Sequence, residues 1–438
     1  MRQTPRTIAF HTLGCKLNFS ETSTISRQFE NGTYRQVAFS GKADIYVINS
    51  CSVTRNAEKR CKALVRQAMN RNPEAMVAVI GCYSQINPEE LLRLPGVGLV
   101  LGNADKFSLF EHIKRWGQTS RAPGQDPVPG AREGVLTHEP VQFEPSWSAE
   151  GRTRSFLKIQ DGCDYFCAYC TIPMARGHSR SGTIGATLRT ASRLAGTGMK
   201  EIVLSGVNIG DFGKAHKERF IDLLNDLAGL EGIERIRISS IEPDLLHDGI
   251  IELVARESRL MPHFHIPLQA GCDQLLKAMG RRYDTALFAG RVEKIRSLMP
   301  RACIAADLIV GFPGETDVLF DKTMQFIRDT DLSYVHVFPY SERDNTRAAR
   351  MPEQVPVATR QHRSRLVHAL SDEKKKKFYE GQLGTTARVL WEEGQAGGTM
   401  GGFTENYIRV QTNYDPALVN QVTEVNLNNL GGDLVFLV

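Results

Sequence analysis

The sequence has no long hydrophobic run and no strong excess of either charge. No segment reaches the roughly 18 consecutive apolar residues of a membrane-spanning helix, so we expect no membrane association. The first residues lead directly into a strand-like run, Thr7–Phe10, without the apolar core of a signal peptide, and we therefore expect a cytoplasmic protein. The 54 Lys and Arg nearly balance the 49 Asp and Glu, which permits a nucleic-acid partner without requiring one.

Nine cysteines are present, and three of them stand close together in the sequence. In a reducing compartment, cysteines serve metal ligation or catalysis more often than disulfides. Cys163, Cys167 and Cys170, here called the loop triad, have the spacing C-x3-C-x2-C. Three thiolates can bind three irons of a cubane cluster and leave the fourth iron open, whereas electron-carrying ferredoxins fill all four positions with cysteine. The alternative is a zinc site, which usually needs four ligands in paired C-x2-C spacings.

Three further cysteines each follow a predicted strand. They are Cys15, Cys51 and Cys82, here called the strand-end triad. Loops at the carboxyl ends of parallel strands form one crevice, so these three residues should converge although they are far apart in sequence. Gly14 and Gly81 beside them suit tight turns and close backbone approach. The pattern predicts a second cluster site, with three small buried strand-end side chains as the alternative.

The length of 438 residues suits two or three domains. Before residue 119, strand-like runs alternate with helical patterns (Asn18–Glu30 and Glu58–Asn70), which predicts a parallel open sheet. Residues 119–150 are rich in Pro, Gly and Ser and lack periodicity, which indicates a linker. Short alternating runs near the C-terminus indicate a small β-barrel. The predicted fold class is α/β. The predicted segments are 1–118 (open parallel sheet), 119–150 (linker), 151–373 (partial barrel of six strand–helix units) and 374–438 (small all-β barrel).

The barrel region contains strand candidates separated by helical patterns. They are Arg154–Ile159, Glu201–Leu204, Arg235–Ser239, His263–Ile266, Ile304–Val310 and Tyr334–Phe338. Active sites of α/β barrels lie at the carboxyl ends of the strands. Polar or glycine-rich residues follow these strands, and the loop triad follows the first. The strand ends could therefore surround one ligand, although such residues also serve simply as turns.

Several basic residues and the three remaining cysteines are interpreted separately from the two triads. Arg176 and Arg180 follow the loop triad and are candidates for RNA phosphate contacts. The run Lys374–Lys377 is interpreted as a solvated helix face, with phosphate contact as the alternative. Three cysteines outside both triads are interpreted as ordinary thiols, namely Cys61, Cys272 and Cys303.

The segments flanking the loop triad, Lys158-Ile-Gln-Asp-Gly162 and Ile172-Pro-Met-Ala-Arg-Gly177, resemble the methylthiotransferase branch of the radical S-adenosylmethionine enzymes. Gly402-Phe-Thr-Glu-Asn-Tyr-Ile-Arg-Val410 is similar to a strand motif of the family's C-terminal TRAM domain, and both triads and the domain order agree. The resemblance implies two 4Fe-4S clusters, one on each triad. The loop-triad cluster would bind and cleave S-adenosylmethionine to a 5′-deoxyadenosyl radical, and the auxiliary cluster would present sulfur for insertion. The implied S-adenosylmethionine contacts are Ser205, Gly206, Ser239, Glu242, Gln269, Gly311 and Phe338.

Three segments resemble the branch that acts on N6-threonylcarbamoyladenosine at position 37 of transfer RNA: Thr12-Leu-Gly-Cys-Lys-Leu-Asn18, Arg237-Ile-Ser-Ser-Ile-Glu-Pro243 and His336-Val-Phe-Pro-Tyr-Ser341. The resemblance implies as partners the anticodon stem-loop of tRNA and an electron donor such as flavodoxin or ferredoxin, with an undetermined sulfur donor. The alternative substrates are isopentenyladenosine tRNA and a ribosomal protein. Residues 378–438 depart from expectation, because 2 basic residues stand against 7 acidic ones in a domain expected to contact phosphate.

Overall fold

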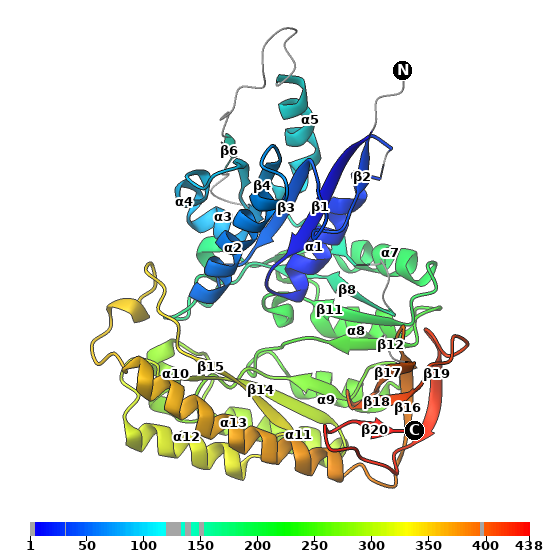
Figure 1. Cartoon of the computed structure of the whole chain (residues 1–438). Coiled ribbons are helices and arrows are strands. Elements are labelled where there is room, and N and C mark those ends of the chain that lie inside the picture. The colour runs from blue at the N-terminus through cyan, green and yellow to red at the C-terminus, as the bar shows by residue number, and fades with distance from the viewer. Residues whose placement is uncertain (1–4, 31, 120–132, 136–141, 149–152, 395–397) are drawn as a thin grey trace.

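The computed structural model describes residues 5–30, 32–119, 133–135, 142–148, 153–394 and 398–438. Figure 1 shows an N-terminal α/β domain above a central partial barrel, with a strand-rich C-terminal domain against one end of that barrel. Most of the predicted linker, 120–132, 136–141 and 149–150, lies outside the described residues. Among the described residues, no helix is both long and apolar enough to cross a membrane.

The N-terminal domain is a parallel sheet with the strand order β2-β1-β3-β4-β5-β6. The central strands β3 and β4 are buried at every position because helices cover both faces. The strands are β1 Arg6–Thr12, β2 Tyr34–Gln36, β3 Ile45–Ser50, β4 Met76–Gly81, β5 Val97–Leu101 and β6 Glu133–Val135. The helices are α1 Lys16–Arg27, α2 Arg55–Arg71, α3 Cys82–Ile86, α4 Pro88–Leu92 and α5 Leu109–Thr119, with a 3-10 turn at Lys106–Ser108. The predicted parallel open sheet is confirmed, and β6 adds a strand from within the stretch interpreted as a linker.

The central domain is a partial α/β barrel made of two sheet segments, β12-β11-β8-β7 and β13-β14-β15. Its strands are β7 Ser146–Trp147, β8 Arg154–Lys158, β11 Glu201–Ser205, β12 Arg235–Ile238, β13 His263–His265, β14 Cys303–Val310 and β15 Tyr334–Pro339. Apart from β7 the pairings are parallel, and a bridge from Ile236 to Leu260 links the two segments. The predicted barrel strands are confirmed.

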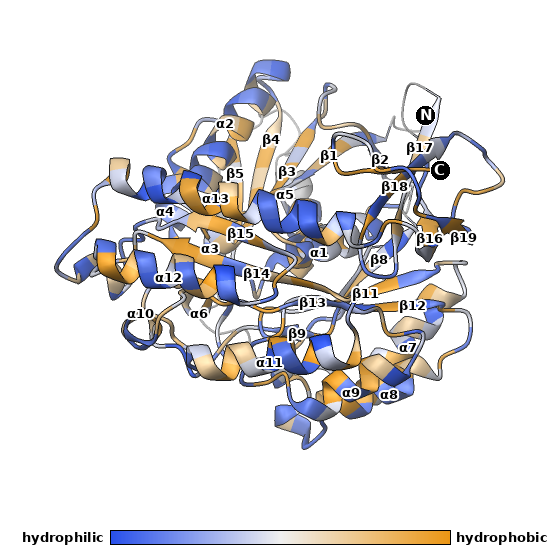
Figure 2. Ribbon diagram, turned by 90° about the horizontal axis from the view of Figure 1, so that it is seen from below, coloured by the Kyte–Doolittle hydropathy of each residue, from blue (hydrophilic) through white to orange (hydrophobic). Residues whose placement is uncertain are grey.

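Helices surround the barrel strands on the outside, and their apolar faces form the largest core with those strands. Figure 2 shows strands such as β14 in the hydrophobic colour and alternating polar and apolar residues on α11 and α12. The helices are α6 Ile172–Arg176, α7 Ile184–Ala195, α8 Phe220–Ala228, α9 Asp248–Arg256, α10 Asp273–Met279, α11 Thr285–Leu298, α12 Asp317–Asp329 and α13 Val357–Glu380. Smaller elements are β9 Gln160–Asp161, β10 Arg180–Ser181 and 3-10 turns at Ile209–Asp211, Lys214–His216 and Ala348–Arg350.

The C-terminal domain is a curved sheet with the order β19-β16-β17-β18-β20. Its strands are β16 Thr386–Trp391, β17 Thr399–Thr404, β18 Arg409–Asn413, β19 Val422–Asn426 and β20 Phe436–Leu437. Helix α13 enters this domain from the barrel and continues past residue 374. Two buried barrel arginines secure the contact: Arg235 donates to the carbonyl oxygens of Arg388 and Phe403, and Arg237 donates to that of Glu405. The strand-rich C-terminal domain was predicted, and the sequence-based fold class is confirmed.

Candidate active site

The loop triad lies directly after the first barrel strand, between β9 and α6. Backbone hydrogen bonds fix the loop: Cys163 N donates to Gly177 O (3.1 Å), and Ala168 N donates to Met279 O (2.8 Å). Phe166 has a φ of 51°, a left-handed conformation that turns the chain between Cys163 and Cys167. The amide of Ile172 at the start of α6 donates to Cys170 Sγ (3.4 Å). Backbone hydrogen bonds within the loop, to Gly177 and to the end of α10 therefore hold the three thiols.

An arginine that the sequence analysis missed lies beside this triad. Arg281 Nη1 donates to Cys167 Sγ (3.1 Å), and its other nitrogen pairs with Glu242. Burial raises the pKa of both Cys163 and Cys170 to about 12. Ligation must therefore displace the thiol protons, as metal binding to cysteine does. The basic and aromatic run Arg281-Arg-Tyr283 after the helix-ending Gly280 was the available sequence signal.

The residues predicted to contact S-adenosylmethionine lie at the carboxyl ends of their strands. Ser205 and Ser239 are buried, whereas the Phe338 side chain is half exposed. A Cβ on Gly206 would lie 2.6 Å from Ile209 Cγ2, and one on Gly311 would lie 2.2 Å from Arg360 Cγ. The close packing against Arg360 thus explains why residue 311 is a glycine. Glu242 is engaged by Arg281, and Gln269 has a φ of 66°. The roles of these residues as ligand contacts stay predictions.

Two buried polar atoms near the loop triad have no hydrogen-bond partner among the described residues, namely Asn208 Oδ1 and Asp244 Oδ1. The other carboxylate oxygen of Asp244 accepts from Tyr165 (2.6 Å), two residues after Cys163. A buried polar group without a partner is costly, so such atoms indicate a place where a polar ligand completes the bonding. Both residues follow strand ends of the barrel, as an S-adenosylmethionine site requires.

The strand-end triad lies at the carboxyl edge of the N-terminal sheet, after β1, β3 and β4. A Cβ on Gly14 would lie 2.9 Å from Cys51 Sγ, so only glycine lets the Cys15 loop approach Cys51 this closely. Burial, followed by the neighbouring Cys82, raises the pKa of Cys51 to about 12. The structure thus places these cysteines side by side although the sequence separates them.

Residues next to the two triads are in contact across the domain boundary. Thr171, next to Cys170, donates from Oγ1 to the carbonyl of Ser52, next to Cys51 (3.5 Å). Asn103 Nδ2 lies 3.5 Å from Cys82 Sγ and donates to Ala175 O in α6 (2.6 Å). Helix α6 therefore connects one triad to the other.

The described residues contain no group of three His, Cys, Asp or Glu side chains close enough to hold a single metal ion. A mononuclear zinc site would need such a group. In a cubane, by contrast, each thiolate binds a different iron, so the sulfurs stand farther apart. Three thiols at each site, with the unpartnered polar atoms near the loop triad, fit a cluster better than a zinc ion.

Between the triads lies a buried set of charged side chains, here called the interface network, which the sequence analysis missed. Glu21 pairs with Lys106 (2.6 Å), Lys158 (3.0 Å) and Arg176 (3.0 Å). Burial alone would raise the pKa of Glu21, but Arg176, Lys106 and Lys158 hold that pKa well below its usual range. The other members are Asp161 and Arg180. The prediction that Arg176 contacts RNA phosphate is wrong, because its side chain is 1% exposed, and Arg180 is paired with Asp161.

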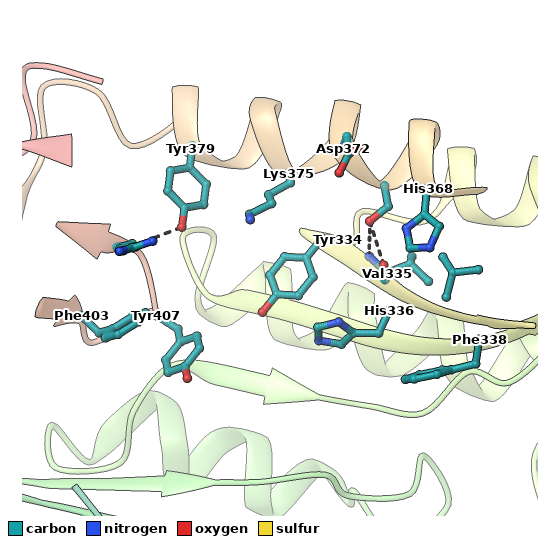
Figure 3. Close-up of a pocket in the computed structure, with 13 residues that line it drawn as sticks. Tyr334, Val335, His336, Phe338, His368, Asp372, Lys375, Tyr379, Phe403 and Tyr407 are labelled. Atoms are coloured by element: carbon teal, nitrogen blue, oxygen red, sulfur yellow. Dashed lines mark hydrogen bonds between the residues drawn. The ribbon is translucent and has the colours of Figure 1, made fainter. Parts of the chain in front are cut away.

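A groove of about 440 Å³ runs between β15, α13 and the C-terminal sheet. In Figure 3, Tyr334, His336 and Phe338 come from β15, His368, Lys375 and Tyr379 from α13, and Phe403 and Tyr407 from the C-terminal domain. The Phe403 and Tyr407 rings are stacked with their centroids 4.7 Å apart. Lys375 and Arg409 add positive charge, and Asp372 is the acidic residue of the lining. The groove therefore combines flat aromatic faces with cations.

Comparisons with known proteins agree with this geometry. Residues 7–102 match the uncharacterized protein family UPF0004, and residues 157–327 match the radical SAM superfamily. The threonylcarbamoyladenosine tRNA methylthiotransferase MtaB of Bacillus subtilis is 36% identical over 97% of this chain and 94% of its own. The tRNA-2-methylthio-N(6)-dimethylallyladenosine synthase of Desulfotalea psychrophila is 29% identical over 98% and 99%. The radical S-adenosylmethionine methyltransferase TsrM of Kitasatospora setae shares the fold, with a TM-score of 0.57, 12% identity and coverage of 79% of this chain and 77% of that one.

Proposed function

Because the chain belongs to the tRNA methylthiotransferases of the radical SAM superfamily, we propose that it adds a methylthio group to carbon 2 of N6-threonylcarbamoyladenosine at position 37 of tRNA. Membership of the superfamily implies a 4Fe-4S cluster and S-adenosylmethionine. The relatives named for threonylcarbamoyladenosine reach 33–36% identity, against 29–32% for those named for dimethylallyladenosine. This difference favours the threonylcarbamoyl substrate.

The observation that carries the proposal is the closeness of the two triads across the domain boundary. The loop triad would hold the cluster that binds S-adenosylmethionine, and the strand-end triad would hold the second cluster. When bound, the first would supply one electron to S-adenosylmethionine, and the second would supply a sulfur that receives a methyl group from a second S-adenosylmethionine. The hydrogen bond between Thr171 and Ser52 holds the two cysteine-bearing segments next to each other. Clusters on both triads could therefore act on one adenine.

The chain's own residues position these groups. Arg281 places a cation against Cys167 and holds Glu242 at the carboxyl end of the barrel. Asn208 and Asp244 offer unpartnered oxygens to a polar ligand. Such positioning is what the protein contributes to cofactor chemistry. The electron itself would come from a flavodoxin- or ferredoxin-type donor.

The groove supports an RNA substrate, because single-stranded nucleotides are recognised by stacking on aromatic side chains while cations meet the phosphates. Phe403 and Tyr407 stack on each other, and the Arg154 guanidinium lies 4.7 Å from the Phe403 ring, so we assign base stacking to the half-exposed Phe338 of the same lining. Lys375 and Arg409 are the cations of the lining. The groove thus offers positive charge to phosphate although residues 378–438 are acidic overall. The anticodon loop would leave its modified adenosine free to enter the barrel.

The test compares two anticodon stem-loops that differ only at position 37, one with threonylcarbamoyladenosine and one with isopentenyladenosine. A site built to hydrogen-bond a polar group rejects an analogue lacking it by about 10⁴-fold or more. We therefore expect methylthio product, measured by mass spectrometry, from the first stem-loop. Equal or better turnover of the second stem-loop, or of a ribosomal protein, would refute the proposed substrate.

A further inference from the structure

Arg176 occupies the junction between the two triads. It is the last residue of α6, the short helix that begins two residues after Cys170. Its guanidinium donates to Glu21 Oε1 (3.0 Å), Asp161 Oδ1 (2.8 Å) and Asn18 Oδ1 (2.6 Å). A side chain 1% exposed and held by partners from both domains has one geometry available to it.

The partners of Arg176 lead directly to the strand-end triad. Asn18 Oδ1 lies 4.0 Å from Cys15 Sγ, and Asn18 Nδ2 donates to the carbonyls of Leu13 (2.7 Å) and Ser50 (2.9 Å), which flank the loops of Cys15 and Cys51. On the other side, Asn103 bonds Ala175, the neighbour of Arg176, and lies against Cys82 Sγ. Asn18 therefore links Arg176 to Cys15, and Asn103 links the neighbouring Ala175 to Cys82.

The charges of the interface network do not balance among themselves. Among the described residues it contains Arg176, Arg180, Lys106 and Lys158 against Glu21 and Asp161, an excess of two positive charges that the exposed Glu144, which lines a cavity with Lys158 and Arg180, offsets only in part. Buried charge is costly unless it is paired, so this excess calls for an anion nearby. A cubane with three thiolates carries about one net negative charge in its oxidised state, and an anionic ligand on the open iron adds about one more. The strand-end site would supply the missing negative charge.

A second feature points to a ligand at the same place. The hydroxyl oxygens of Ser52 and Ser84 are buried and have no hydrogen-bond partner in the part of the chain that the structure describes. Ser52 follows Cys51, and Ser84 stands two residues after Cys82. Each side chain is 0% exposed, so solvent does not satisfy it. Sulfides of a bound cluster would accept hydrogen bonds from such hydroxyls.

We infer that Arg176 is the positioning residue of the auxiliary cluster: it holds the network's excess positive charge beside Cys15 and Cys82 and locks α6 between the two triads. This inference rests on the proposed function, because it needs a cluster on the strand-end triad. Reduction adds one negative charge to that cluster, and a cation held nearby stabilises the reduced form. Arg176 therefore raises the reduction potential of the auxiliary cluster.

The experiment measures that potential directly and without RNA. A full-length background with Cys163→Ala, Cys167→Ala and Cys170→Ala leaves one cluster site, so an EPR-monitored redox titration reports the auxiliary cluster. Arg176→Gln removes the charge, and Arg176→Lys retains it. Arg180→Gln is the matched control, because Arg180 pairs with Asp161 but bonds neither Asn18 nor Asn103 in the described residues.

We expect Arg176→Gln to make reduction at least tenfold less favourable, a downward shift of about 59 mV for a one-electron couple. Arg176→Lys should keep most of the parent potential, and Arg180→Gln should shift it less than Arg176→Gln does. An unchanged potential in Arg176→Gln, or equal shifts in the lysine and glutamine variants, would overturn the inference.

A second variant decides the question if Arg176→Gln does not fold. Asn103→Asp places a carboxylate where an amide now faces Cys82, with nearly the same shape. Its potential must fall below that of the parent, and an unchanged value overturns the inference. A background protein without iron would instead refute the auxiliary cluster, and with it the proposed function.

Discussion

The two triads differ in how the chain assembles them. The loop triad spans eight residues, and backbone hydrogen bonds within and beside the loop shape it. The strand-end triad consists of one cysteine from the segment after each of three strands, so the packing of the whole sheet determines its geometry. Their surroundings differ as well: Arg281 and Glu242 flank the first, whereas the second lies next to the interface network.

This contrast predicts different sensitivities. A site formed by one loop keeps its ligands together as long as that loop is anchored. A site formed by distant strand ends depends on the packing of the sheet, and in this protein also on a buried charge network shared with the barrel. Perturbing the domain interface should therefore harm the strand-end site first, while removing either triad separates the two chemical tasks.

The largest expected effect is the loss of S-adenosylmethionine cleavage when Cys163, Cys167 and Cys170 are all changed to Ala. Reductive cleavage should become undetectable, because the cluster that would bind S-adenosylmethionine at the carboxyl end of the barrel is lost, while roughly half of the iron stays on the strand-end triad. Anaerobic incubation with dithionite, followed by chromatography of 5′-deoxyadenosine, measures the first quantity, and a colorimetric iron assay the second. Persistent 5′-deoxyadenosine would assign the cleavage to another site.

Changing Cys15, Cys51 and Cys82 to Ala should have the opposite pattern. The variant should still cleave S-adenosylmethionine but form no methylthio product, since the sulfur-presenting site is gone. Nucleoside mass spectrometry measures the product. Cys61→Ala is the control, because Cys61 lies fully buried on α2 in the same domain and belongs to neither triad. Product from the triple variant would make the strand-end cysteines packing residues.

Glu21→Gln should lower the free energy of unfolding and affect the strand-end triad more than the loop triad. Lys106, Lys158 and Arg176 would lose their shared buried carboxylate, and breaking such a pair costs about 3–5 kcal/mol. Urea unfolding should show this loss, and iron should leave the strand-end triad before the loop triad. Glu90→Gln is the control, because Glu90 pairs with Lys62 near the surface and should cost at most about 1 kcal/mol.

The same residue predicts a pH dependence. Because the folded-state pKa of Glu21 is lowered, its stabilisation is complete above the ordinary value of 4.5 and is lost as the pH falls below that value. The urea midpoint of the apoprotein should therefore stay nearly constant down to about pH 5 and fall steadily as the pH is lowered further. The drop should be smaller in Glu21→Gln, and equal drops in both proteins would show that Glu21 contributes no acid sensitivity.

The smallest expected effect concerns RNA. Lys375 lines the groove, whereas the adjacent Lys376 is exposed and lies 3.7 Å from Glu380. Lys375→Gln should weaken stem-loop binding several-fold and lower the salt dependence of binding by about one phosphate contact. Fluorescence anisotropy at several salt concentrations measures both quantities. Lys376→Gln should match the parent protein, and equal effects of the two changes would place the RNA elsewhere.

The central strands of the N-terminal sheet could be predicted because they are buried at every position and are therefore mainly apolar. Two of the strand-like runs predicted before residue 119, Ile45–Asn49 and Val77–Ile80, coincide with β3 and β4 for this reason. The strand β2, Tyr34–Gln36, was missed, because it is short, largely exposed and lacks an apolar pattern. Helix α13 continues across residue 374, where a change of charge had suggested a boundary.

The sequence by itself determined the loop triad, since its spacing and the geometry of one short loop are local properties. It also determined the order of strands and helices and the position of each strand-end cysteine in that order. The strand-end rule also predicted that Cys15, Cys51 and Cys82 converge. Only the tertiary structure decided that this triad lies next to the loop triad and that Arg176 is buried between the domains. The reason is that Arg176 and Glu21 are 155 residues apart. Nothing in the local pattern of a charged residue reveals a partner that folding brings from another domain.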